Sequence, residues 1–463
     1  MLDLLEYTIQ RAVKLGAAQA EAFYLAENKL QTAIEKRQVK NCEKKFDSGV
    51  GLRVALKKKG GYSTGFSYFT DLTREAAEKI IPQTLRMASF KKPDKDFGSF
   101  QEKKLAVQVK KINDKAITRI EPEAVIDLAN DLVKTASVDK KITTIGGRVN
   151  LSTGRIALAN SLGVSGDYSF SRYNIGGFVV AQDAGSVAVG WDEHSDCFFD
   201  EDAAYVVFKN ASKNALSQLH AKAIKTEKMD LLIQPVALAL LLGSTLTSAV
   251  RADNIQKSQS PFAGKLGQSV ASDSLSIVDD GHVPQAFGSR PFDDEGFPSQ
   301  TTKIIDKGRL KSFLHNTYTS SKDRVKSTGN SLRSMGGFGT RQRYSVEPQI
   351  GSTNIRLAAG IKSAEDSIDA VMSEVKNGVI AKGVIGAFTA NPQSGEFSVA
   401  LDLAYKVEKG GVSFPVKQAM IGGNIQDLLK NVSLLADDVT HIGWEHTSII
   451  TPTVLVKNVT VSG

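Results

Sequence analysis

The sequence predicts an α+β protein in which helices lie on an antiparallel sheet in the N-terminal region. A β-rich, barrel-like C-terminal domain is predicted around a buried apolar helix. Three observations lead to this fold class. Amphipathic helices alternate with strand-like runs in the first half of the chain, and glycine-rich, strand-rich segments fill the second half. Between them, Val236 to Val250 reads as a helix with leucine on every side, and such a helix must be buried.

The length of 463 residues is too great for one ordinary core, so two or three domains are expected. Changes in periodicity divide the chain at two places. The predicted units are an N-terminal α+β domain (1–100), a middle α+β domain (101–224) and a C-terminal β-rich domain (225–463).

The apolar run from Met229 to Val250 is barely long enough to span a bilayer. Asp230, Gln234 and Pro235 interrupt its first part, and glycine, serine and threonine dilute its second part. Pro235 suits the first position of a helix, where a missing amide costs nothing. The run is therefore interpreted as the core helix of a soluble domain and not as a membrane span.

In the first domain, apolar residues at helical spacing from Leu2 to Val13 predict a helix. Strand-like runs follow, and the lysine-glycine turn Lys57–Gly61 is interpreted as a solvated hairpin, not a phosphate-binding patch. Asp71 is predicted to cap the next helix, and Pro82 to break or bend it. The polar stretch Lys91–Phe100 reads as a linker.

In the middle domain, Pro122 begins an amphipathic helix, and alternating runs from Ile142 to Val189 predict an antiparallel sheet. A long helix from about Asp200 to Lys222 closes this unit. The C-terminal remainder is rich in short strands, with one more clear helix at Ala364–Lys376. Many short strands around the apolar helix favour a twisted sheet or barrel.

The composition is that of a globular protein, with 41% hydrophobic and 23% charged residues. Cys42 and Cys197 give neither a disulfide framework nor a Cys-x-x-Cys pair, which suits a reducing compartment. The N-terminus resembles an amphipathic helix and not a signal peptide, so a cytoplasmic location is expected. The net charge of +8 permits acidic partners, but basic residues are spread along the chain, so nucleic-acid binding is not expected.

Several segments of the second half resemble a known family. In order they are FAGKLGQSVASDSLSIVDDG (Phe262–Gly281), a longer stretch beginning DDEGFPSQTTK (Asp293–Lys322), STGN (Ser327–Asn330), NPQSGEFSVAL (Asn391–Leu401) and IGGNIQDLL (Ile421–Leu429). With these segments the chain resembles the TldD/PmbA family over nearly its whole length. The two paralogous subunits of that family form a cytoplasmic zinc-dependent peptidase.

In the zinc-bearing subunit of that family, the buried helix carries His-Glu-x-x-x-His, and a C-terminal cysteine completes the site. Here Leu240 and Leu241 fall about where His-Glu would be, and Thr245 about where the second histidine would be. No His, Glu or Cys occurs between Asp230 and Asp253, and the C-terminal cysteine is absent. The resemblance therefore implies the metal-free subunit, with no catalytic residue and no cofactor of its own and with zinc in the TldD-like partner.

Two histidine segments offer alternative metal sites. His441, Glu445 and His446, in HIGWEH, lie near the region where the third zinc ligand of the family belongs, and their spacing could converge on one ion. His194 stands among acids in WDEHSDC. Adjacent residues of a strand or turn point in different directions, so a solvated loop is the preferred interpretation of that segment.

The resemblance also assigns framework and cavity positions, which serve turn geometry and backbone hydrogen bonding and not catalysis. These positions are Asn160, Ser161, Gly163, Glu295, Gly296, Thr328, Gly329, Asn330, Gly395, Phe397, Ser398, Gly423 and Asn424.

The leading hypothesis is the non-catalytic subunit of a heterodimeric TldD/TldE-like zinc metallopeptidase. The resemblance implies that the C-terminal domain packs against a zinc-bearing paralogue, and that unfolded peptides enter the enclosed cavity as extended strands. A homodimer is the expected form when the paralogue is absent. Two alternatives stay open: a binding or regulatory protein of the gyrase-modulator type without peptidase activity, and an independent hydrolase that uses HIGWEH.

Overall fold

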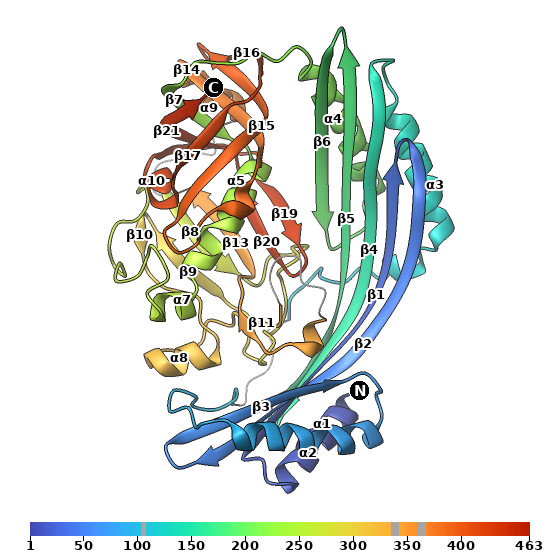
Figure 1. Cartoon of the computed structure of the whole chain (residues 1–463), viewed down its shortest axis with the longest axis vertical. Helices are drawn as coiled ribbons and strands as arrows, with labels where there is room; N and C mark the ends of the chain where they lie inside the picture. The colour runs from blue at the N-terminus through green and yellow to red at the C-terminus, as the bar shows by residue number, and fades with distance from the viewer. Residues whose placement is uncertain (103–107, 335–341, 360–366) are drawn as a thin grey trace.

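The computed structural model describes residues 1–102, 108–334, 342–359 and 367–463. A long six-stranded antiparallel sheet fills the N-terminal half, and the C-terminal domain packs against one of its faces (Figure 1). The strand order is β3-β2-β1-β4-β5-β6. The strands are β1 (Gln19–Glu35), β2 (Gln38–Lys58), β3 (Gly61–Phe69), β4 (Ile142–Asn160), β5 (Ser165–Asp183) and β6 (Ser186–Asp196).

The first two predicted domains share this sheet, because β4 pairs with β1 along almost its full length. Two helix pairs cover the outer face at opposite ends of the strands. The first pair is α1 (Leu2–Lys14) and α2 (Arg74–Phe90), and the second is α3 (Pro122–Ala136) and α4 (Glu201–Ser217). Asp200 caps α4 by accepting a hydrogen bond from the Ala203 amide, which agrees with the predicted start of that helix.

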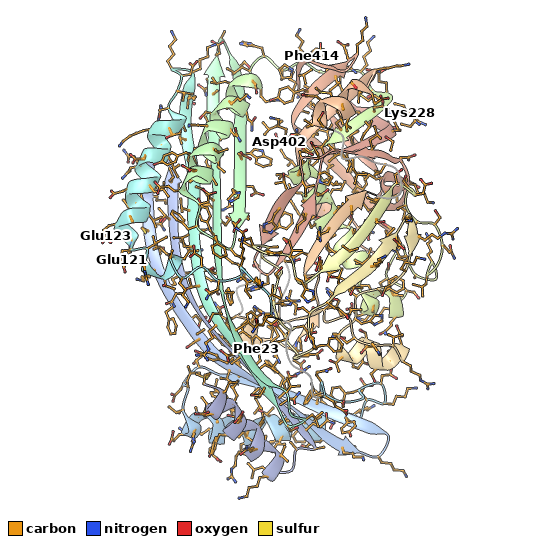
Figure 2. All side chains as sticks on the ribbon, turned by 180° about the vertical axis from the view of Figure 1, so that it is seen from behind. Phe23, Glu121, Glu123, Lys228, Asp402 and Phe414 are labelled. Atoms are coloured by element: carbon orange, nitrogen blue, oxygen red, sulfur yellow. The ribbon has the colours of Figure 1, made fainter. Side chains whose placement is uncertain are left out.

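Successive residues of the long strands belong to different cores, because side chains alternate between the two faces of a sheet. On β1, Leu30 and Ile34 pack with α3 and α4. Phe23 and Leu25, on the opposite face, pack with Phe292 of the C-terminal domain. Figure 2 shows Phe23 from behind, where the sheet crosses that domain. This strand is therefore buried on both faces over its first part, from Gln19 to Leu25.

Several local predictions in the first domain need correction. Thr73, and not Asp71, caps α2, since its hydroxyl accepts a hydrogen bond from the Ala76 amide. Pro82 lies inside α2 without ending it. The loss of one backbone hydrogen bond is offset there by a continuous buried face that includes Ile81 and Ala88.

The predicted hairpin at Lys57–Gly61 is confirmed, because β2 and β3 pair up to Lys58 and Gly61. The stretch Lys91–Phe100 is not a free linker. Tyr62 and Asp94 exchange backbone hydrogen bonds, and Phe100 is buried. The segment around His194 is also not a solvated loop, since it lies in β6 and pairs with Ile175 of β5.

The C-terminal domain contains a barrel and a second sheet, which confirms the predicted β-rich, barrel-like architecture. The barrel closes in the order β14, β7, β21, β17, β15 and back to β14. Its strands are β7 (Glu227–Ile233), β14 (Asn377–Ile385), β15 (Glu396–Glu408), β17 (Met420–Asn424) and β21 (Val454–Ser462), with β16 (Gly411–Val416) and β18 (Val432–Leu435) attached. The second sheet contains β8 (Leu275–Asp280), β9 (Thr301–Asp306), β10 (Arg309–Leu310), β13 (Asn354–Ala359), β19 (Thr440–Trp444) and β20 (Thr447–Thr451).

The remaining elements of this domain are short. Its helices are α5 (Pro235–Ser244), α6 (Leu246–Ala249), α7 (Ala252–Gln256), α8 (Thr317–Asp323), α9 (Ile368–Ser373) and α10 (Ile425–Lys430). A two-stranded pair is formed by β11 (Ser331–Leu332) and β12 (Gln349–Ile350), and 3-10 turns lie at Arg343–Ser345 and Ala387–Thr389. A further 3-10 turn, Ile117–Arg119, precedes α3 in the N-terminal half. The predicted helix at Ala364–Lys376 is shorter than expected, and its first residues lie outside the described part of the chain.

The apolar helix packs between the barrel and the second sheet, against β14 on one side and β19 and β20 on the other. It is not continuous to Val250 as predicted, because α5 ends at Ser244 and α6 begins at Leu246. At the break, the Thr245 hydroxyl donates to the Leu241 carbonyl oxygen at 2.6 Å. Among the described residues, no helix is long and apolar enough to cross a membrane.

Candidate functional site

A groove of about 740 Å³ lies between the N-terminal sheet and the C-terminal domain. Three parts of the chain line it: the middle of β4 and β5, the segment from α5 to α7, and loops and strand ends of the C-terminal domain. Its size lies in the range of ligand-binding clefts. The groove is the candidate functional site because the buried helix of the sequence prediction meets it.

One side of the α5–α6 segment faces the groove. Gly243, Thr247 and Ser248 line it, followed by Arg251 at the start of α7. The opposite side is core, where Leu241 and Thr245 are fully buried. Buried leucines, with Pro235 at the start of the helix, therefore occupy one side of this segment, and small or hydroxyl-bearing residues occupy the other.

Leu240, Leu241 and Thr245 are the positions that the sequence comparison assigned to the zinc motif. None of them lines the groove. Leu240 is half-buried and packs against the main apolar cluster of the domain. The helix breaks after Ser244, and this break changes which of the following residues face the groove. The periodicity of the sequence did not predict the break. Within the described part of the chain, no group of three or more His, Cys, Asp or Glu side chains is close enough to hold a metal.

The wall formed by the N-terminal sheet was not predicted. Arg148 and Asn150 of β4 and Asn174 of β5 line the groove, and Asn150 pairs directly with Asn174 across the strands. The Arg148 guanidinium donates to the Asn174 side-chain oxygen at 3.2 Å. Polar residues at alternate positions of a predicted strand were the available signal, because such residues share one face.

The opposite wall is more apolar. It includes Leu332 and Ile350 of the β11–β12 pair, Trp444 at the end of β19, and Phe388, whose side chain is 79% exposed. An exposed aromatic side chain on one wall and polar side chains on the other offer a ligand both apolar and hydrogen-bonding contacts.

The C-terminal histidines do not converge as a metal site. Glu445 is exposed in the β19–β20 turn. His441 accepts a hydrogen bond from the Phe287 amide through Nε2 at 3.3 Å, whereas His446 lies beside the Arg343 guanidinium, with 3.4 Å between Nδ1 and Nη1. Positive charge next to His446 repels a metal cation.

Both imidazoles are held neutral. Burial lowers the pKa of His441 to about 4. Burial, followed by the positive charges of Arg343, Arg172 and Arg290, lowers the pKa of His446 well below its ordinary value.

Stability is expected to fall as the pH falls from about 6.5 towards 4. Native pKa values below the unfolded value mean that unfolding takes up protons, so the stabilisation present at neutral pH is lost in acid. The urea midpoint of unfolding, measured between pH 7 and pH 4, should therefore depend less on pH in His441→Gln. His220→Gln, at an exposed position, is the matched control. An unchanged pH slope in His441→Gln would contradict this origin of the acid sensitivity.

A buried carboxyl acts in the opposite direction. Burial and the neighbouring Glu295 raise the pKa of Asp293, so its contribution to stability is largest at low pH and decreases as pH rises. The pH dependence of the wild-type urea midpoint combines the opposing contributions of the histidines and Asp293. The difference between His441→Gln and the His220→Gln control isolates the contribution of the His441 imidazole.

The framework positions from the family resemblance lie outside the groove lining, in three separate places. The first is the β4–β5 turn, where the Asn160 side chain accepts from the amides of Leu162 and Val164, Ser161 Oγ accepts from the Ala20 amide, and Gly163 has φ of +92°.

The second place is the pair of loops around residues 293–296 and 327–330. Glu295 accepts hydrogen bonds from Arg53 and from the Thr317 amide. Gly296 has φ of +82°, and an added Cβ would lie 2.5 Å from Val164. Thr328 bonds to the backbone of His315, Gly329 has φ of +69°, and the Asn330 amide donates to Asp279.

The third place is the contact between β15 and β17. Phe397 pairs with Gly423, and Ser398 with Gly422. Gly395 has φ of +79°, and Asn424 caps α10 by accepting from the Gln426 amide. The turn and backbone roles predicted for these positions fit this geometry, but a position in the groove does not.

Models of one protein family match most of the chain. The PmbA/TldA metallopeptidase C-terminal domain matches residues 226–463, the central domain matches residues 115–219, and domain 1 matches residues 20–88. The metalloprotease PmbA homolog of Haemophilus influenzae is 24% identical over 462 residues, which are 99% of this chain and 95% of that protein.

Two solved structures share the fold. TldE from Thermococcus kodakarensis superposes with a TM-score of 0.88 at 22% identity, covering 99% of this chain and 100% of that one. A putative modulator of a DNA gyrase from Thermotoga maritima has a TM-score of 0.87 at 24% identity, covering 99% of both chains.

Proposed function

Since the chain belongs to the TldD/PmbA family of metallopeptidases, we propose that it is the non-catalytic subunit of a heterodimeric peptidase that degrades or processes unfolded peptides. Zinc, supplied by a TldD-like paralogue, would activate the water that cleaves the peptide bond. The present chain would form part of the wall along which the peptide lies.

The observation that carries this proposal is the chemistry of the groove-facing helix side. Gly243 offers no side chain, and Thr247 and Ser248 offer neutral hydroxyls. A catalytic zinc site needs imidazole, thiolate or carboxylate donors, so these residues do not fit zinc. The donor set of this chain therefore favours a structural role beside a metal-bearing partner.

The spacing of the zinc motif also fits a register three residues later than the one expected from the sequence. In His-Glu-x-x-x-His, the second histidine comes five residues after the first. Gly243 and Ser248 have this spacing and both line the groove, whereas Thr245 is fully buried. Gly243, Ser244 and Ser248 are thus our proposed equivalents of the motif, in place of Leu240, Leu241 and Thr245.

Co-expression with a paralogue that carries His-Glu-x-x-x-His is the direct test. An unstructured peptide should be cleaved only by the mixture, and zinc should be found with the paralogue. The chain alone, whether a monomer or a homodimer, should be inactive. Cleavage and stoichiometric zinc in the chain alone would contradict the proposal, and a stable but inactive pair would favour the regulatory alternative.

Filling the groove should reduce activity without separating the subunits. Thr247→Trp places a large ring where Thr247 lines the groove. We expect the rate of peptide cleavage by the pair to fall about tenfold or more, because the peptide loses its binding position. Thr143→Trp, at an exposed position outside the groove lining, is the control. Equal activity of the two variants would show that peptides do not use this groove.

The cytoplasm is the proposed location of this pair. Cys42 and Cys197 are both free thiols, and burial raises the pKa of Cys197 to about 12. Free thiols are typical of a reducing compartment.

A further inference from the structure

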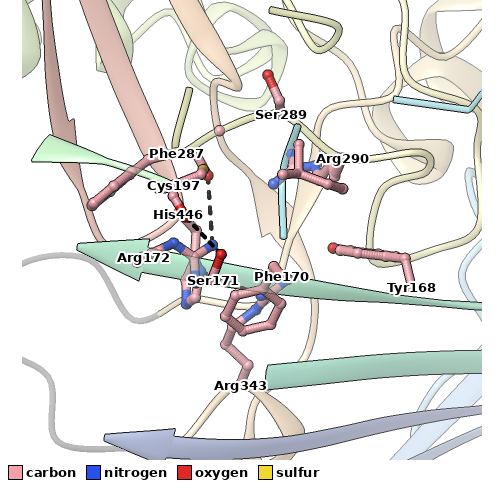
Figure 3. Close-up of a pocket in the computed structure, with 12 residues that line it drawn as sticks. Tyr168, Phe170, Ser171, Arg172, Cys197, Phe287, Ser289, Arg290, Arg343 and His446 are labelled. Atoms are coloured by element: carbon pink, nitrogen blue, oxygen red, sulfur yellow. Dashed lines mark hydrogen bonds between the residues drawn. The ribbon is translucent and has the colours of Figure 1, made fainter. Parts of the chain in front are cut away.

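A second, much smaller cavity adjoins the groove and is surrounded by arginines (Figure 3). Arg172 of β5, Arg290 from the loop after β8, and Arg343 from the turn before β12 all line it. Arg290 and Arg343 are only 3% and 5% exposed. Three guanidinium groups from separate parts of the chain therefore meet in one buried place.

The carboxylates nearby do not balance these charges. Arg343 forms an ion pair with Asp294. Arg172 and Arg290 form no ion pair with any described residue. Burial raises the pKa values of the neighbouring Asp279 and Asp293, which favours their neutral forms. Glu27 also acts on Arg172 and Arg343, but it is paired with Lys29, so two of the three guanidinium groups have no ion-pair partner among the described residues.

Several N–H groups of the cluster also lack acceptors. Within the described part of the chain, no hydrogen-bond partner is present for Arg172 Nε and Nη1, Arg290 Nε and Nη2, or Arg343 Nε, although all are shielded from solvent. Arg172 instead packs over the Phe170 ring, with 4.2 Å between its guanidinium carbon and the ring centroid. Buried donors without acceptors are destabilising, and buried unpaired charges more so.

The other described residues that line the cavity carry no negative charge that would take the place of an anion beside the arginines. His446 is neutral, as described above, because burial and the three arginines lower its pKa. Ser171 and Ser289 already donate to the carbonyl oxygens of Cys197 and Val283. The Tyr168 hydroxyl points towards the cavity beside Arg290 (Figure 3).

We propose that this cavity is a binding site for one small monovalent anion, held by Arg172, Arg290 and Arg343. A negative charge would accept hydrogen bonds from donors that otherwise have none, and it would balance charge that the neighbouring carboxylates leave uncompensated. The cavity volume is about 10 Å³, close to the space that one water molecule requires. A halide ion or a single carboxylate group matches this size better than phosphate.

Two sources could supply this charge. The cavity and the groove share Phe287 and His446 in their linings, so the site lies directly beside the groove. The anion could be a free ion, or it could be the carboxylate of a peptide lying in the groove. The second source rests on the function proposed above, whereas the site itself does not.

Bromide is the direct probe, because its anomalous scattering locates it in a crystal. Crystals of the full chain soaked in sodium bromide should show one strong anomalous peak between the three guanidinium groups. In solution, titration with sodium bromide or sodium acetate, at an ionic strength held constant with sodium sulfate, should give saturable binding. Arg290→Met should weaken it about tenfold or more, whereas the exposed Arg86→Met should not.

Absence of bromide from the cavity, or equal bromide binding by wild type and Arg290→Met, would overturn the site. If Arg290→Met does not fold, the bromide-soaked wild-type crystal decides alone. In the active pair, a peptide with a free C-terminal carboxylate and its amide distinguish the sources. A rise in KM confined to the free acid in Arg290→Met would identify the peptide carboxylate, and equal KM changes together with bound bromide would identify a free ion.

Discussion

Glu21→Gln is expected to destabilise the protein by about 3 to 5 kcal/mol, although Glu21 is not part of the groove lining. Its carboxylate is completely buried and accepts from Arg53 at 3.0 Å and from Arg333 at 2.7 Å. Arg53 also donates to Glu295. The cluster therefore joins β1 and β2 of the long sheet to two loops of the C-terminal domain.

The neutral amide would leave too much positive charge in this interface. Glu21 and then Glu295 raise the pKa of Arg53, although burial alone would lower it, and Glu295 is still present in the variant. Arg333 has Glu21 as its direct ion-pair partner, and burial lowers its pKa to about 10. The loss of Glu21 thus leaves the Arg333 guanidinium uncompensated where water cannot reach it.

Urea unfolding of Glu21→Gln measures this effect. Glu35→Gln, in an exposed pair with Lys40, is the control and should cost less than about 1 kcal/mol. The double variant Glu21→Met with Arg333→Met removes one charge of each sign, so it should be more stable than Glu21→Gln. A double variant that is less stable than Glu21→Gln would show that shape, and not charge, dominates this interface.

Gly190→Ala is expected to cost about 3 kcal/mol or more. Gly190 lies in β6 under α4, where an added Cβ would lie 2.0 Å from the Ala215 nitrogen and 2.4 Å from the Ala211 oxygen. Both atoms belong to the backbone of α4, so no side-chain rotation relieves the overlap. The helix would have to move away from the sheet and lose part of the buried contact around Phe208 and Ala211.

Gly176→Ala in β5 is the matched control for Gly190→Ala. The nearest atom to its added Cβ is the guanidinium carbon of Arg148 at 3.5 Å, an ordinary contact, so the change should stay within about 0.5 kcal/mol. Hydrogen exchange should show faster opening of α4 in Gly190→Ala and not in Gly176→Ala. Equal urea midpoints of the two variants would show that α4 adapts to the extra methyl group.

Local patterns predicted much of the fold. The first helix, the hairpin at Lys57–Gly61, the Asp200 start of α4 and the β-rich C-terminal domain all depend on residues a few positions apart. Predictions failed where packing outweighed propensity. Pro82 stays inside α2 because a buried helix face offsets one lost hydrogen bond, and His194 lies in a strand because β5 pairs with it.

Less of the candidate sites than of the fold could be predicted from the sequence. The apolar run pointed to the helix beside the groove, and the absence of His, Glu and Cys from that run indicated its chemistry. Which side of the helix meets the groove depends on the break at Thr245 and on the two sheets that cover its other sides. The polar wall at Arg148 and Asn150 depends on how the long sheet crosses the C-terminal domain.

The sequence by itself indicated the family, the main helices and strand-rich stretches of the N-terminal half, and the lack of zinc-binding side chains on the core helix. The tertiary structure alone decided the charged clusters. Glu21 and Arg333 are 312 residues apart, and Arg172, Arg290 and Arg343 come from three separate segments. No local periodicity links such residues, because their contacts form only when the C-terminal domain packs on the sheet and removes water from both surfaces.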